Sequence, residues 1–155
     1  IINVFNSADK SIDVFTDGED LYGLYSHPEV IEAMERAAKP EEMLVYHYNR
    51  GARSLNERRH KDASYDFGHV ESLLQKLDIT PDCLHKVPEE KRETFRRFYR
   101  NAYNNAGWAS MNTERWQNAV VLFNKSLEFD PGNELAIKNL VNCYAKLWSM
   151  SERTP

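Results

Sequence analysis

The sequence predicts a mainly all-α protein, an array of antiparallel helix pairs preceded by a short β-hairpin-like segment. Three observations support this fold class. Residues 49–67 match residues 105–123 without a gap at seven of 19 positions. Apolar side chains recur at helical spacing through most of the chain, and proline or glycine separates the periodic segments. A repeat at a fixed offset is typical of folds in which each unit packs only against its neighbours.

Composition limits the class of protein before any motif is considered. The chain has 155 residues, 41% of them hydrophobic, and a net charge of −4, with the acidic excess concentrated in residues 1–44. No apolar run approaches the ~20 residues that cross a bilayer, so we expect a soluble chain without a membrane partner. The two cysteines, Cys83 and Cys143, lie far apart, which favours a reducing, cytoplasmic location over a disulfide framework.

A β-containing appendage is predicted at residues 1–25. Two β-rich runs, 1–6 and 11–16, flank a turn-like segment at 7–10. An isolated hairpin is marginally stable in water, so these strands are also interpreted as the end of an upstream domain. The chain begins with Ile1 and not Met, and we therefore expect it to be a processed or excised piece.

A helical domain is expected over residues 26–149, followed by a frayed tail at 150–155. Its first helix starts at a capping box, Ser26 to Glu29. The next segments at helical spacing predict a first helix pair, a second helix pair and a final helix, with a proline-bounded turn at 81–87 between the pairs. Their expected ranges are 40–56, 61–77, 88–111, 114–129 and 134–148.

Residues 100–133 resemble a tetratricopeptide repeat, a pair of helices with small and large side chains at set positions. With the earlier copy, the resemblance covers 44–148 and implies two repeats plus a C-terminal capping helix. The signature residues are Gly51, Ala63, Phe67, Gly107, Ala119, Phe123 and Pro131. The chain departs from the family pattern because its two copies are separated by more than one repeat length. It also departs at Gln75, which stands where the first copy would have its closing proline.

The resemblance implies a scaffold that binds a protein or peptide partner in the concave groove of the first helix of each pair. The residues implied to line it are Tyr48, Asn49, Asn101, Asn104, Asn105, Trp108, Lys138 and Asn142. Amide side chains there can bond a peptide backbone, and the aromatic residues can anchor it. The alternative is that the amides bond neighbouring helices and the aromatics belong to the core. A clamp for a terminal carboxylate is not expected, because only Asn105 matches that pattern.

Other chemistry finds little support in the sequence. Two basic clusters, at 50–61 and 86–100, are expected to face solvent or an acidic partner and not nucleic acid, because acidic residues share their helices and the net charge is negative. No grouping of His, Cys or carboxylate residues suggests a catalytic or metal site, and no cofactor is expected.

Two hypotheses stay open beside the binding scaffold. In the first, the chain is a non-catalytic accessory C-terminal domain of a larger enzyme whose catalytic part precedes Ile1. The final helix, with Leu147 and Trp148, also suggests a homodimer through that helix.

Overall fold

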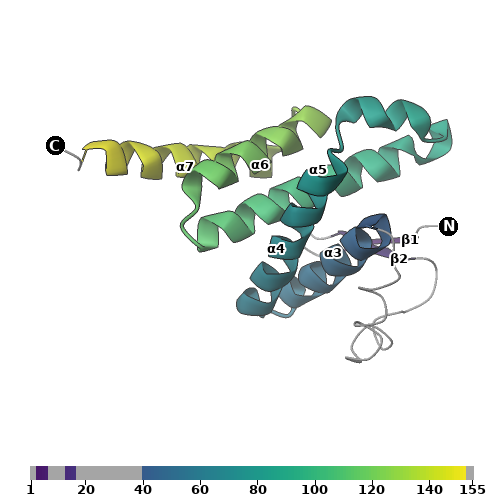
Figure 1. The fold of residues 1–155 in the computed structure, drawn as a ribbon, viewed down its shortest axis with the longest axis horizontal. Coiled ribbons are helices and arrows are strands. Elements are labelled where there is room, and N and C mark those ends of the chain that lie inside the picture. Colours follow the sequence, from purple (N-terminus) through teal and green to yellow (C-terminus); the bar gives the residue numbers. More distant parts are fainter. Residues whose placement is uncertain (1–2, 7–12, 17–39, 153–155) are drawn as a thin grey trace. The chain divides into compact units, whose positions relative to one another are not determined.

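The computed structural model describes residues 3–6, 13–16 and 40–152 (Figure 1). These residues form two β-strands, five α-helices and one 3-10 helix, so the prediction of a mainly all-α fold is confirmed. The chain divides into two compact units, Ile1–Asp78 and Ile79–Pro155. The predicted domain boundaries at 25/26 and 149/150 stay predictions.

Unit 1 begins with a two-stranded antiparallel sheet. Strand β1 (Asn3–Asn6) pairs with β2 (Asp13–Thr16), with Phe5 opposite Val14. The two predicted β-rich runs are therefore confirmed as strands. Helix α3 lies beside β2. The helix expected to start at Ser26 lies outside the described residues.

Helices α3 (Pro40–Asn56) and α4 (His60–Leu77) form the helical hairpin of unit 1. Proline at the first position of α3 suits a helix start, because a backbone N–H at that position would have no partner within the helix. Apolar residues at helical spacing, among them Leu44, Phe67 and Leu74, are buried where the two helices meet.

Unit 2 contains the 3-10 helix η1 (Pro81–Lys86), followed by α5 (Glu89–Asn112), α6 (Trp116–Phe129) and α7 (Glu134–Glu152). Helix α6 packs against both α5 and α7. Helix α7 continues past the predicted end at Trp148, since the sequence there has no proline or glycine to stop it.

The turn between α6 and α7 is fastened to α5 by two arginines. Arg100 Nη1 donates to Asp130 Oδ2 at 3.0 Å, and Arg96 Nη1 donates to the carbonyl of Phe129 at 3.0 Å. The backbone N–H of Gly132 donates to Asp130 Oδ1 at 3.2 Å. Pro131, the predicted closing proline, therefore sits in a turn that its neighbours fix in place.

The hairpins α3–α4 and α5–α6 repeat one close contact at positions that the sequence match pairs. A Cβ atom added to Gly51 would lie 2.8 Å from the ring of Phe67, and one added to Gly107 would lie 2.7 Å from the ring of Phe123. Both distances are too short for real atoms, so only glycine lets the ring occupy this place. Ala63 and Ala119, the small residues of the second helices, are fully buried.

The turns of the two hairpins also match. Arg58 and Glu114, which the alignment of the two copies pairs, both have a φ of 61°. The next backbone N–H in each turn, that of Arg59 or Arg115, donates to the carbonyl of Ser54 or Ser110 at 2.8 and 2.9 Å. The repeat seen in the sequence is thus a repeat of backbone conformation.

Candidate functional site

The eight residues implied to line a groove differ in their exposure. Buried residues are Tyr48 and Asn49 in unit 1 and Asn101, Asn104 and Asn105 in unit 2. Trp108 is half-buried, and Lys138 and Asn142 on α7 are exposed. Tyr48 has no exposed surface and its ring lies 6.2 Å from that of Phe67, so the structure places it among core side chains.

Two neighbouring asparagines on α5 have amide atoms without partners. Among the described residues, neither Asn104 Oδ1 nor Asn105 Nδ2 has a hydrogen-bond partner, although both atoms are buried. One atom is an acceptor and the other is a donor. A buried polar atom without a partner destabilises the folded state by about 1–3 kcal/mol, and a ligand that supplied a donor and an acceptor here would remove that cost. We call Asn104 and Asn105 the amide pair.

Unit 1 contains a buried polar network that the sequence analysis missed. Asp66 on α4 is 2% exposed, and its Oδ1 lies 2.9 Å from His47 Nδ1 on α3. Arg50, one turn along α3 from Tyr46, donates from Nε to both carboxylate oxygens of Asp66 at 2.9 Å. Burial lowers the pKa of Arg50, but the hydrogen bond and charge of Asp66 outweigh that effect, so the pKa lies above its usual value.

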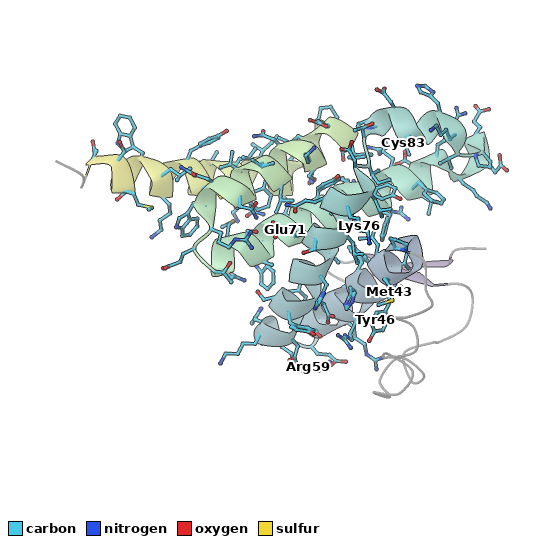
Figure 2. The ribbon with its side chains drawn as sticks, in the orientation of Figure 1. Met43, Tyr46, Arg59, Glu71, Lys76 and Cys83 are labelled. Atoms are coloured by element: carbon cyan, nitrogen blue, oxygen red, sulfur yellow. The ribbon has the colours of Figure 1, made fainter. Side chains whose placement is uncertain are left out.

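Aromatic rings surround this network. His47 stacks on His69 of α4 with ring centroids 4.5 Å apart, and the edge of Tyr65 meets His69 at 4.8 Å. The guanidinium of Arg50 lies 4.9 Å from the ring centre of Tyr46, within the range of a cation–π contact. Figure 2 shows Tyr46 on α3. The network therefore joins the middle of α3 to the middle of α4.

The contacts of the network give it a structural role. A carboxylate bonded to Nδ1 orients a histidine for proton transfer in some enzymes. Here His47 Nδ1 bonds to Asp66 and the His47 ring stacks on His69, so both contacts hold α3 against α4. The sequence signal for the network is Asp66 itself, a charged residue next to Phe67 and three positions after Ala63 on the buried face of α4.

Arginines of the second basic cluster, at 86–100, form hydrogen bonds within unit 2. Arg96 and Arg100 hold the turn after α6, and Arg92 Nε donates to the carbonyl of Val87 at 3.0 Å. Arg96 also forms an ion pair with Glu93. These contacts give Arg92, Arg96 and Arg100 a role in fastening η1, α5 and the α6–α7 turn.

In the described part of the chain, no three His, Cys, Asp or Glu side chains are grouped so as to hold a metal ion. None of the described helices has the length and apolar character needed to span a bilayer. Cys83 and Cys143 are both free thiols, and burial raises the pKa of Cys143.

The fold and these contacts define the class as a mainly α-helical protein with repeated helical hairpins. No family model, curated protein or solved structure matches the chain. Its function is therefore argued from the contacts described above.

Proposed function

We propose that residues 44–148 form a tetratricopeptide-like scaffold that binds a partner protein through an extended segment, with α5 as the main contact helix. The amide pair is the observation that carries the proposal. An extended peptide offers a backbone N–H and a C=O at each residue, and these are the groups that Asn104 Oδ1 and Asn105 Nδ2 lack. Half-buried Trp108 follows on the same helix, where an aromatic ring can anchor a bound side chain.

Several features accompany this proposal. Exposed Lys138 and Asn142 on α7 supply further polar contacts, and the two free cysteines agree with a reducing, cytoplasmic location. We do not assign a catalytic role to the chain. The accessory-domain hypothesis stays a prediction, which the coding sequence upstream of Ile1 tests.

The experiment is selection of binding peptides from a random library displayed on phage, followed by calorimetry with the selected peptide. Changing Asn104→Ala or Asn105→Ala removes a hydrogen bond and should lower the affinity by roughly tenfold, as expected for one to two lost bonds. Asn124→Ala, an exposed asparagine on α6, is the matched control and should leave the affinity unchanged.

Thermal unfolding separates binding from stability. Both variants should keep the helical circular dichroism of the parent chain, and this is checked before their affinities are compared. Equal affinity for the parent and both variants, or failure to select any peptide, would contradict the proposal.

A further inference from the structure

The outer face of α7 presents a continuous apolar stripe. Ile137, Val141, Tyr144 and Trp148, which we call the outer stripe, are 44%, 61%, 53% and 69% exposed. Their spacing of four, three and four residues places them on one face of the helix. A surface helix normally keeps its apolar side chains on the stripe that faces the core and presents polar side chains to solvent, so an exposed apolar stripe is unusual for a surface in contact with water.

A second apolar stripe on the same helix is already buried. Ala136, Leu140 and Cys143 pack into a core with Ala119 and Phe123 of α6. The outer stripe is this inner stripe shifted by one residue, about 100° around the helix. Leu147 belongs with the inner, half-buried residues, so the structure separates it from Trp148, with which the sequence grouped it.

We propose that the outer stripe binds the outer stripe of a second copy of this chain, with the two α7 helices antiparallel. The spacing reads the same in both directions, so an antiparallel pairing about a two-fold axis sets each apolar residue opposite another. The first half of the stripe is aliphatic and the second half is aromatic. An antiparallel pairing therefore sets Ile137 against Trp148 of the second copy, and Val141 against Tyr144 of the second copy.

The size of the stripe limits the area that the dimer can bury. Four half-exposed side chains, two of them aromatic, expose on the order of 500 Å² per copy, so a dimer buries roughly 1,000 Å² in total. That area lies at the lower limit of specific interfaces, and we expect half-dimerisation at roughly 10–100 μM. None of the four side chains is charged, so closing the interface removes no ion from water.

Sedimentation equilibrium over about 5–500 μM tests the interface, a range that brackets the expected midpoint. The parent chain should convert from monomer to dimer. Val141→Glu places a charge at the centre of the stripe and should raise the midpoint concentration at least tenfold. The matched control is Val121→Glu on α6, where the valine is similarly exposed, at 53%, but lies off the stripe; its midpoint should equal that of the parent.

Cross-linking tests the antiparallel register, with Cys83→Ser in every variant. A mixture of the Ile137→Cys and Trp148→Cys chains should form a disulfide-linked dimer on mild oxidation, whereas either chain alone should not. A parent chain that stays monomeric throughout the range would overturn the proposal, as expected if another protein or a further segment covers the stripe. A dimer insensitive to Val141→Glu, or Ile137→Cys linking to itself, would also overturn it.

The outer stripe and the amide pair are on different helices and make separate claims. Asn104→Ala, on α5, should leave the dimer midpoint unchanged. Loss of peptide binding therefore does not count against the dimer, and loss of the dimer does not count against peptide binding.

Discussion

The hairpins α3–α4 and α5–α6 share their backbone geometry but differ in what fills their interior. In the first, Asp66 binds His47 and Arg50 in a buried polar network. The corresponding positions of the second hairpin, in the same register, hold Leu122, Tyr103 and Ala106, all buried. The contact between glycine and phenylalanine is common to both hairpins.

This difference shows that the buried side chains of a hairpin have two separate roles. The glycine, alanine and phenylalanine positions set how closely the helices approach, and they are the same in both hairpins. The other buried positions fill the remaining space, and they accept either an ion network or apolar side chains. A buried ion network contributes little net stability compared with well-packed apolar residues, although breaking it is costly.

The largest effect is expected from breaking the network at its centre. Asp66→Ala leaves His47 and Arg50 without their shared carboxylate, and should lower the free energy of unfolding by about 3–5 kcal/mol. Urea-induced unfolding followed by circular dichroism measures the change. A loss below about 1 kcal/mol would mean that the network is dispensable.

Replacing the whole network is the matched control for that experiment. The triple variant His47→Phe, Arg50→Ala and Asp66→Leu copies the apolar interior of the second hairpin at positions 50 and 66. Its unfolding free energy should stay within about 1 kcal/mol of the parent value or exceed it. A triple variant as unstable as Asp66→Ala would show that the two interiors are not interchangeable.

A smaller effect is expected at the glycines. Gly51→Ala and Gly107→Ala each push a methyl group into a buried phenylalanine ring, and each should lower the unfolding free energy by about 1–3 kcal/mol. Gly68 on α4 has no atom within 4 Å of an added Cβ, so Gly68→Ala should instead raise it by about 0.5–1 kcal/mol. Stabilisation by either of the first two changes would contradict the shared contact.

The sequence predicted the hairpins because their determinants are local or repeat at a fixed offset. Helix α3 has the predicted bounds, and α5 begins and ends within one residue of the expected 88–111. Gly51 and Phe67 have the same separation along the chain as Gly107 and Phe123. The match between the copies therefore identified these positions as equivalent, and the contact between the glycine and the phenylalanine ring emerged from the structure.

The polar features were less accessible to sequence reasoning. Asp66 and His47 are 19 residues apart on different helices, and periodicity does not say which side chains bond across a hairpin. For the same reason, burial of the amide pair and its missing partners emerged only from the packed structure. The groove itself, and the tetratricopeptide assignment, stay predictions.

The smallest effect is expected at the end of the second hairpin, where Asp130 has no counterpart in the first. Burial raises the pKa of Asp130. The hydrogen bonds from Arg100 and the Gly132 N–H, together with the charges of Arg96 and Arg100, lower the pKa by more than burial raises it, so it lies below the usual value. The stabilisation is therefore present above the unfolded-state pKa of about 3.9 and is lost as the pH falls through the lower folded value.

Asp130→Asn tests this contribution. The variant should be less stable than the parent by about 0.2–1 kcal/mol at pH 7, and the two should converge below about pH 4. Urea midpoints measured from pH 3 to pH 7 follow the difference. A constant difference across that range would show that the charge of Asp130 is not its cause.

The contact between Gly107 and Phe123 has a consequence for divergence among descendants of this chain. The ring occupies the room that a methyl group on residue 107 would need, so neither position is free to drift alone. A lineage that acquires alanine at 107 is expected to acquire a slimmer residue, such as leucine, at 123. Positions 51 and 67 should covary in the same way, and independently of positions 107 and 123.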